Sequence, residues 1–382
     1  MSNSDPIRVL ALLDDTVVSG KVKPVLTLAG YARDHRESQP SLEISMLTFV
    51  RGESDPEFVR TLARDGFAID VVRERRRFDL GVFRQLREIV DRRKPHVLWT
   101  HGAKTHFLVR VAGLHRDAAW VASHHGYTAT SLTWRLYDQL DRWSLRGANS
   151  VIAACEAFAV DLHTRLRIPK ARLSVHRSPI AIDSTLATRA EHPSIRAALG
   201  LPANARIVLS VGRLSKEKAH ADLIRAMPMV KRDCNFPVAL VIVGDGPEER
   251  RLESLSAQLG VAGAVHLAGY QDDVSPYYEA ADVFALTSSS EGSPNVLLEA
   301  MDAGVPILAT SVGGVVEIIR HREEGWLVES GDVEAIARGL VALLVNPALG
   351  EALRLGARRS LAAYAPERYY VGVRSVFEKA RA

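Results

Sequence analysis

The sequence predicts an α/β protein built from two doubly wound domains in tandem. The chain has 382 residues, which exceeds the roughly 100–200 residues of one ordinary domain. Both halves alternate short apolar runs, which end in glycine or small polar residues, with amphipathic stretches of helical period. This order of strand, helix and strand is typical of parallel sheets with helices on both faces. The pattern also restarts near the middle of the chain, which indicates a second sheet.

Eleven apolar runs are expected to be strands, because each is short and bounded by turn-forming residues. In the first half they are 7–13, 42–50, 68–72, 96–102, 119–126 and 150–155, and in the second half 205–214, 238–246, 264–270, 281–289 and 305–314. Residues 177–205 contain three prolines and little strand pattern, so we interpret them as the linker. The predicted parts are an N-terminal domain at 1–180, a C-terminal domain at 181–365 and a final helix at 366–382 that packs back on the N-terminal domain.

Composition narrows the functional classes. The two cysteines have no paired spacing, which indicates reduced thiols. Neither a signal-peptide pattern nor an apolar run of ~18 residues is present, so we expect a cytoplasmic protein. No HExxH motif, aspartate-rich metal loop or GxSxG motif occurs, and we therefore expect neither a metal cofactor nor a serine hydrolase.

The charge is divided unevenly along the chain. Residues 1–180 carry 28 basic and 20 acidic side chains, whereas the remainder carries 21 and 25. The basic cluster RERRR at 73–77 could meet an anionic membrane surface or an acidic polymer. It has no interleaved aromatic residues, so we do not expect nucleic acid as a partner. A solvated charged loop is the alternative interpretation.

The stretch SSSEGSPNVLLEAMDAG at 288–304 carries two glutamates within one strand–helix unit. Glu291 lies in a loop of small residues after a predicted strand, and Pro294 suits the first position of the helix that follows. Glu299 lies inside that helix, where a carboxylate needs hydrogen-bond donors such as sugar hydroxyls. The free N–H groups at the helix start would bind an anion. An ordinary loop residue and a half-exposed helix residue remain the alternative.

A basic loop follows the first strand of the second half. Arg213 and Lys218 in GRLSKEKAH could neutralise a diphosphate, the former by forked hydrogen bonds and the latter as a point charge. A solvated loop is again the alternative. Further on, LVIVGDGPEER lacks the third glycine of a dinucleotide-binding GxGxxG motif, because Glu249 stands there. Gly246 instead indicates a tight turn in which the backbone approaches a ligand.

Two further candidates lie in the first half. Gly20 follows the first strand and precedes a helical stretch, where backbone can approach a phosphate, and His125 follows another strand in SHHGYTAT. Since ligands of doubly wound sheets bind beyond the carboxyl ends of the strands, we expect the active site in the cleft between the domains.

These motifs together resemble one family. The segments SVGRLSKEK, LVIVGDGPE and VHLAGYQDDVSPYYEAADVFALTSSSEGSPNVLLEAMDAGVPILATSVGGVVEII, with SHHG and the Gly20 loop, are similar to the retaining glycosyltransferases of the two-Rossmann-domain (GT-B) type. More narrowly, the chain resembles glycosyltransferase family 4, whose E-x7-E motif matches Glu291 and Glu299. It departs from many relatives in SGKVK, which lacks a double glycine, and in the linker SPIAID.

The resemblance implies a role for each matching residue. Arg213 and Lys218 match the pair that contacts the donor diphosphate, Glu291 lies close to the transferred sugar, and Glu299 holds the ribose hydroxyls. The resemblance places His125 near the donor sugar. The expected catalytic residues are Glu291, Arg213, Lys218 and His125. The expected donor-binding residues are Gly20, Arg213, Lys218, Gly246, Tyr270, Glu291, Gly292, Ser293, Pro294, Asn295, Val296 and Glu299.

The activity implied is transfer of a sugar, with retention at the anomeric carbon, from a nucleotide diphosphate sugar to a hydroxyl of a glycan or lipid-linked acceptor. UDP is the expected base, while GDP and ADP stay open. No cofactor is expected beyond the nucleotide sugar as co-substrate. The N-terminal domain would bind the acceptor, the C-terminal domain the donor, and the basic half could contact the inner face of an anionic membrane. The alternatives are a nucleotide-sugar epimerase or hydrolase on the same fold, and a non-catalytic nucleotide-sugar-binding subunit.

Overall fold

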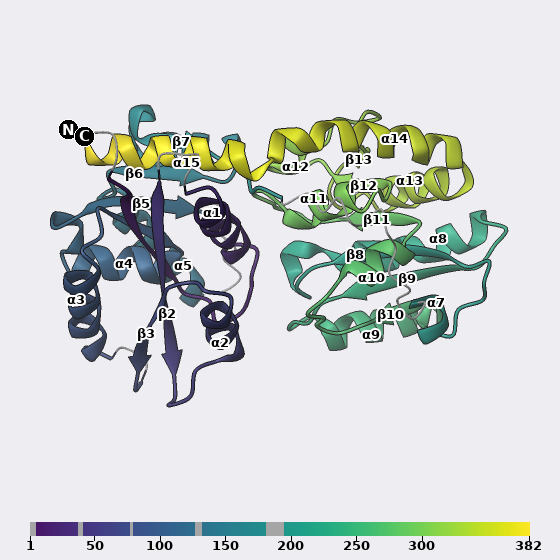
Figure 1. The fold of residues 1–382 in the computed structure, drawn as a ribbon. Coiled ribbons are helices and arrows are strands. Elements are labelled where there is room, and N and C mark those ends of the chain that lie inside the picture. Colours follow the sequence, from purple (N-terminus) through teal and green to yellow (C-terminus); the bar gives the residue numbers. More distant parts are fainter. Residues whose placement is uncertain (1–4, 37–40, 77–78, 127–131, 181–194) are drawn as a thin grey trace. The chain divides into compact units, whose positions relative to one another are not determined.

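The computed structural model describes residues 5–36, 41–76, 79–126, 132–180 and 195–382 (Figure 1). The chain forms two compact units. Unit 1 comprises Met1–Ala181 and Tyr364–Ala382, and unit 2 comprises Ile182–Ala363. Each unit contains one parallel sheet with helices on both faces, which confirms the predicted α/β class of two doubly wound domains.

Unit 1 is built on a seven-stranded sheet in the order β3-β2-β1-β4-β5-β6-β7. Its strands are β1 Ile7–Leu13, β2 Leu42–Arg51, β3 Ile69–Glu74, β4 Val97–His101, β5 Ala119–His124, β6 Ser150–Ala153 and β7 Leu173–Val175. Its helices are α1 Val22–Asp34, α2 Glu57–Arg64, α3 Gly81–Arg93, α4 Ala103–Val111, α5 Leu132–Leu145, α6 Glu156–Leu166 and α15 Pro366–Arg381, with 3-10 turns η1 Leu114–Arg116 and η2 Lys170–Arg172.

Unit 2 has a six-stranded sheet in the order β10-β9-β8-β11-β12-β13. Its strands are β8 Arg206–Val211, β9 Val238–Val243, β10 Val265–Leu267, β11 Val283–Leu286, β12 Ile307–Thr310 and β13 Trp326–Val328. Its helices are α7 Ile195–Ala198, α8 His220–Asp233, α9 Glu249–Gln258, α10 Ser275–Ala280, α11 Asn295–Asp302, α12 Val315–Ile318, α13 Val333–Val345 and α14 Pro347–Ser360. The 3-10 turns are η4 Lys216–Lys218, η5 Ala262–Ala264 and η6 Leu361–Tyr364, whose last residue belongs to unit 1.

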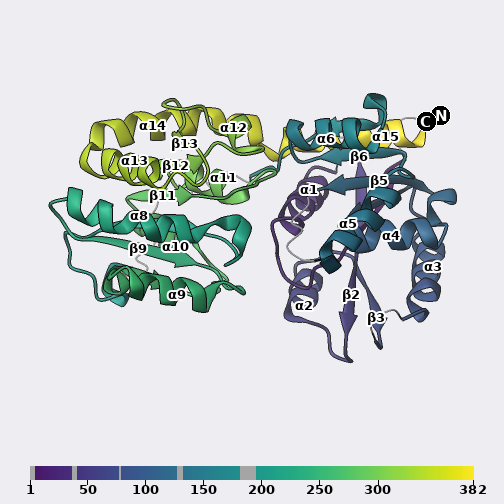
Figure 2. The same ribbon diagram turned by 180° about the vertical axis from the view of Figure 1, so that it is seen from behind.

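Alternate residues of the central strands serve two separate cores in unit 1. In β1, Leu10 and Leu12 join the core beneath α3 to α6, whereas Val9 and Leu13 join the core beneath α1, α2 and α15. Figure 2 shows α4 and α5 on the first of these faces. Because both faces are covered, the strands are continuous apolar runs without alternation, which is typical of parallel sheets.

All eleven predicted strands are present, each centred within its predicted run. The edge strands β7 and β13 were not predicted. Each has only three residues, and β7 is half-buried throughout. Such short pieces carry no apolar run that distinguishes them from loops.

The final helix α15 packs within unit 1. The ring of Phe377 lies edge-on to that of Trp99 in β4, with centroids 5.4 Å apart. Tyr370 and Val373 are buried in the same core. In the described residues no single helix is long and apolar enough to span a membrane. The segments Val333–Val345 and Pro347–Arg381, which a sharp bend separates, reach that length and apolar content only when they are taken together.

Candidate functional site

In unit 2, the predicted donor-binding loops follow β8 and β11, two neighbouring strands at the centre of the sheet. The chain continues from β8 to β9 on one side and from β11 to β12 on the other. In doubly wound sheets, the crevice at this reversal of strand order is where ligands bind. Lys218 ends the turn after β8, and Glu291 lies in the loop after β11. The topology alone therefore brings these two segments together.

An ion pair joins the two loops. Nζ of Lys218 lies 2.6 Å from Oε1 of Glu291, and the hydroxyl of Ser288 donates a hydrogen bond of 2.6 Å to the same oxygen. The Glu291 side chain is 8% exposed and that of Lys218 is 22% exposed. Charge-assisted hydrogen bonds of this kind are short and fix the direction of a buried carboxylate. A lysine and a glutamate are thus held side by side beyond the carboxyl ends of the two central strands.

Backbone contacts fix the loop that carries Glu291. The N–H of Ser289 donates to the carbonyl of Glu217 at 2.8 Å, and the N–H of Gly314 donates to the carbonyl of Glu291 at 3.1 Å. At Gly313, which has φ +46°, a Cβ would lie 2.0 Å from the same Glu291 carbonyl oxygen. Only glycine fits at this position, because any side chain would push the Glu291 backbone away.

Gly246 also allows a close approach, although of a different kind from the one predicted. Its φ is +153°, and a Cβ there would lie 2.4 Å from the carbonyl oxygen of Leu214. The backbone that approaches Gly246 is thus the loop after β8. Gly246 holds that loop, which carries Arg213 and Lys218, against the end of β9. Whether a ligand also contacts Gly246 stays a prediction.

Glu299 lies in α11 with its side chain half-buried. The hydroxyl of Tyr278 in α10 donates one bifurcated hydrogen bond, which reaches Oε2 of Glu299 at 3.1 Å and the carbonyl of Val296 at 3.2 Å. Tyr278 is buried, and burial raises the pKa of its hydroxyl well above the usual value. It therefore stays a donor that orients the carboxylate. Helix α11 begins at Asn295, one residue later than predicted, because Pro294 has an extended conformation at the N-cap.

The other predicted residues of unit 2 have different exposures. Arg213 is exposed in the turn after β8, and Tyr270 is 54% exposed beyond β10. Gly292 and Ser293 are half-buried in the loop before α11. Val296 lies in the first turn of α11 and is half-buried. The structure thus pairs Lys218 with Glu291 directly, while it leaves Arg213 at the surface.

In unit 1, Gly20 and His125 also follow central strands. Gly20 lies between β1 and α1 and is exposed, and His125 follows β5 and is half-buried. Nε2 of His125 lies 3.3 Å from Nδ1 of His101. Loss of hydration, with a smaller effect of Lys21, lowers the pKa of His125 to about 3. The imidazole is therefore neutral near pH 7.

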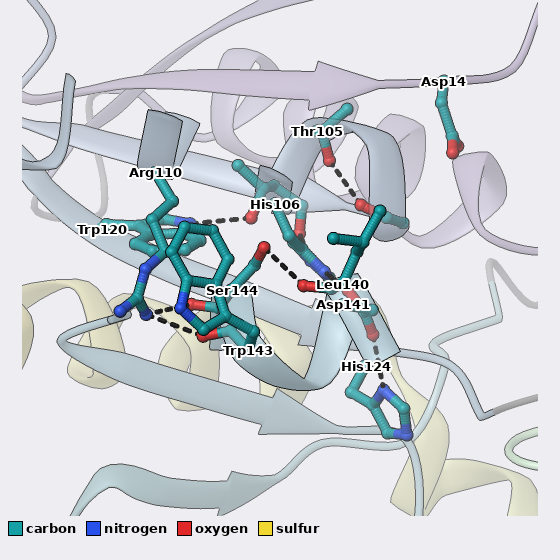
Figure 3. Close-up of polar contacts among 12 residues, drawn as sticks. Asp14, Thr105, His106, Arg110, Trp120, His124, Leu140, Asp141, Trp143 and Ser144 are labelled. Atoms are coloured by element: carbon teal, nitrogen blue, oxygen red, sulfur yellow. Dashed lines mark hydrogen bonds and ion pairs between the residues drawn. The ribbon is translucent and has the colours of Figure 1, made fainter. Parts of the chain in front are cut away.

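A buried network around His124, the residue before His125, was not predicted (Figure 3). Nδ1 of His106 in α4 is 2.6 Å from Oδ1 of Asp141 in α5, and Nδ1 of His124 in β5 is 4.0 Å from Oδ2. Burial lowers the pKa of His124 to about 4, although Asp141 opposes this shift. The network ties α4 and α5 to the end of β5, and so it positions the residue before His125.

The arrangement offers hydrogen-bonding and charged groups rather than a metal-binding cluster. Across the part of the chain that the structure describes, no group of three or more histidine, cysteine, aspartate or glutamate side chains is placed to hold a metal ion. Lys218 can attract an anion, and Glu291 and Glu299 can accept hydrogen bonds from hydroxyl groups. This set of groups suits a ligand that has both phosphates and a polyol.

Two protein families match the chain along most of its length. Residues 31–183 match the family described as Glycosyltransferase Family 4, and residues 191–365 match Glycosyl transferases group 1. The chain belongs to the family 4, group 1 glycosyltransferases. The second match contains the Lys218–Glu291 pair and Glu299, and the first contains His125. The family that the motifs resembled is therefore confirmed.

Individual curated proteins are similar to parts of this chain. The chain is 38% identical over 154 residues to the lipopolysaccharide core biosynthesis glycosyltransferase LpsE of Rhizobium meliloti. The aligned region covers 40% of this chain and 44% of LpsE. The chain is 26% identical over 288 residues to N-acetyl-alpha-D-glucosaminyl L-malate synthase of Bacillus anthracis, which covers 74% of each chain. The matches to LpsE and to LpsD of the same organism span only 44% and 48% of those relatives.

Solved structures share the fold over nearly the whole chain. The crystal structure of Anabaena Alr3699/HepE in complex with UDP and glucose has a TM-score of 0.80 at 20% identity, and it covers 97% of this chain and 99% of its own. Sucrose-phosphate synthase from Thermosynechococcus elongatus has a TM-score of 0.78 at 20% identity, covering 97% and 98%. The two-domain GT-B fold is thereby confirmed.

Proposed function

We propose that this glycosyltransferase moves a sugar, with retention at the anomeric carbon, from a nucleotide diphosphate sugar to a hydroxyl of a glycan or glycolipid acceptor in cell-surface polysaccharide or glycoconjugate synthesis. The observation that carries the proposal is the Lys218–Glu291 pair at the reversal of strand order in unit 2. UDP is the proposed base. The complexes of Anabaena Alr3699/HepE with UDP and with UDP-glucose support this base, and the role named for LpsE supports a glycoconjugate acceptor.

The donor would displace an existing interaction. The diphosphate would take Lys218 as its counter-ion, with the exposed Arg213 as a second cation, so that Glu291 is released to accept a hydrogen bond from a hydroxyl of the sugar. The N–H groups of the loop and first turn at 292–296 would bind sugar hydroxyls and phosphate. Glu299, already oriented by Tyr278, would hold the ribose hydroxyls. With two cations and these N–H groups available, we propose that no metal ion is required.

In the transfer step, the bond from the anomeric carbon to the diphosphate breaks while the acceptor oxygen attacks from the same face. The leaving phosphate takes the proton of the acceptor hydroxyl. Lys218 and Arg213 would stabilise the negative charge that develops on the leaving group, which is the kind of stabilisation that contributes most in such sites. His125 is proposed to contact the transferred sugar as a neutral group, which suits its pKa of about 3.

We further propose that unit 1 binds the acceptor and that its basic side chains contact the inner face of an anionic membrane from the cytoplasm. The excess of basic over acidic side chains in residues 1–180 supports this contact. Nucleic acid is not a proposed partner.

The test is a donor screen followed by product analysis. UDP, GDP and ADP sugars are compared by thermal shift, and the anomeric configuration of the product is determined by NMR with and without a chelator. Lys218→Ala and Arg213→Ala should weaken donor binding, whereas Lys216→Ala, which removes an exposed lysine from the same turn, should not. If no nucleotide sugar stabilises the protein and the first two variants behave as wild type, the proposal is wrong. Conversion of the donor without an acceptor would favour the epimerase or hydrolase, and donor binding without turnover would favour the non-catalytic subunit.

A further inference from the structure

Unit 1 contains an apolar pocket that the proposed transfer site does not use. It is lined by residues of α3, α4 and α5. Figure 2 shows α4 and α5 in front of the sheet of unit 1. Its volume is about 480 Å³, which falls within the ~300–1,000 Å³ of small-molecule sites. The apolar lining includes Val82, Phe83, Phe107, Leu108 and Leu140. Such a lining offers few partners to the hydroxyl groups of a sugar or to a peptide backbone, and it suits a hydrocarbon.

One end of the pocket is charged. Glu74 at the end of β3 pairs with Nζ of Lys104 at 2.6 Å and with Nε of Arg51 at 3.4 Å, and all three residues line the pocket. The ammonium group of Lys104 also lies 4.1 Å from the centre of the Phe49 ring. Two cations thus share the carboxylate of Glu74, so this end of the pocket is polar.

The described part of the basic cluster RERRR, residues 73–76, is joined to this pocket through Asp79. Asp79 lines the pocket, and its carboxylate accepts hydrogen bonds of 2.8 Å from the N–H of Arg75 and from the N–H of Gly81. Arg75 and Arg76 are both exposed in this loop. The backbone of Arg75 is therefore held at the pocket by Asp79, and the guanidinium groups of Arg75 and Arg76 lie at the surface.

Two exposed apolar side chains complete the rim. Leu80 is 76% exposed at the start of α3, and Val111 is 48% exposed at the end of α4, and both line the pocket. Apolar side chains beside arginines are typical of surfaces that contact the boundary between lipid head groups and acyl chains. The rim and the interior thus have the chemistry of an amphiphile site.

We propose that this pocket binds one hydrocarbon chain of an anionic lipid, whose head group lies against Arg75 and Arg76. This pocket is where the membrane contact of the proposed function would be made, and the inference rests on that part of the proposed function. Binding is measured without any sugar donor, so its failure and the failure of the transferase proposal are distinguishable.

The first experiment probes the pocket. Isothermal titration uses dodecyl phosphate below its micelle concentration, with dodecyl maltoside and inorganic phosphate as comparisons. Wild type should bind dodecyl phosphate more tightly than either. Val111→Trp, which puts a larger side chain into the pocket lining at the end of α4, should weaken binding at least tenfold. Val160→Trp, which changes a valine 58% exposed on α6, should not. Equal binding by Val111→Trp and wild type, or equal binding of the two detergents, would overturn the proposal.

The second experiment probes the head-group contact and does not depend on packing in the pocket. The double variant Arg75→Glu/Arg76→Glu should bind dodecyl phosphate at least tenfold more weakly and should no longer co-sediment with vesicles of phosphatidylglycerol and phosphatidylcholine. Arg165→Glu, at an arginine whose side chain is 69% exposed on α6, is the matched control. Vesicle binding that survives the double variant, or that is lost equally in the control, would show that the basic loop is not the contact.

Discussion

Replacing Gly313 with alanine tests whether the Glu291 backbone is held in place for donor binding. A Cβ at this position would lie 2.0 Å from the Glu291 carbonyl oxygen, and real Cβ contacts essentially never fall below 3.0 Å. The two segments must therefore separate by about 1 Å. A displacement of ~1 Å in a catalytic group can cost about 100-fold in rate. The residue also has φ +46°, which costs an alanine about 1–2 kcal/mol.

The control separates these two effects. Gly260 has φ +67° and no atom within 4 Å of its Cβ position, so Gly260→Ala carries the backbone strain without the displacement. We expect both variants to unfold at lower denaturant concentration, and only Gly313→Ala to lose about 100-fold in kcat/KM and to bind the donor nucleotide more weakly. If Gly313→Ala matches Gly260→Ala in both rate and nucleotide affinity, the position of the Glu291 backbone is not what the site depends on.

Three further predictions follow from the contacts described above. Lys218→Met should lower the free energy of unfolding by about 1–3 kcal/mol, because Glu291 loses its buried counter-ion, and adding Glu291→Gln should restore stability in urea titrations without restoring sugar transfer. Tyr278→Phe removes the hydroxyl that orients Glu299, and it should cost about 1 kcal/mol and raise the KM for the donor more than it lowers kcat; equal effects on both would contradict the assigned role. Folding lowers the pKa of His124 from 6.5 to about 4, so the unfolded chain binds the proton more tightly than the folded chain. About 3 kcal/mol of the free energy of unfolding, present above pH 6.5, should therefore be lost as the pH falls towards 4. Urea titrations across this range, repeated on His124→Asn, should show a smaller loss in the variant.

The fold was predictable because the central strands are buried on both faces and stand out as apolar runs. The boundaries of β1 coincide with the predicted range, whereas β11 occupies only Val283–Leu286 of the predicted 281–289. The predicted range is longer than the strand because apolar and small residues continue into the loop that carries Glu291. The strands β7 and β13 were missed because three residues at the edge of a sheet need no continuous apolar sequence.

The site was predictable where its residues lie close together in the sequence. Glu291 and Glu299 share one strand–helix unit, and their spacing is visible without a structure. Tyr278 and Asp141 were missed, since their partners lie 21 and 35 residues away and only the folded chain brings them together. Tyr278 is the second of two adjacent tyrosines in SPYYEA, and nothing in this sequence indicates that its hydroxyl meets a carboxylate.

The placement of α15 has a consequence for the order in which the chain folds during synthesis. Most of unit 1 precedes unit 2 in the chain, yet one of the two cores of unit 1 requires Tyr370, Val373 and Phe377, which are synthesised after the whole of unit 2. Unit 2 is continuous in sequence and is complete before those residues emerge. Although domains usually fold in order from the N-terminus, here the second unit can finish first. Until α15 arrives, the apolar surface around Trp99 is uncovered, so truncation of the last helix should cause aggregation of unit 1 rather than loss of unit 2.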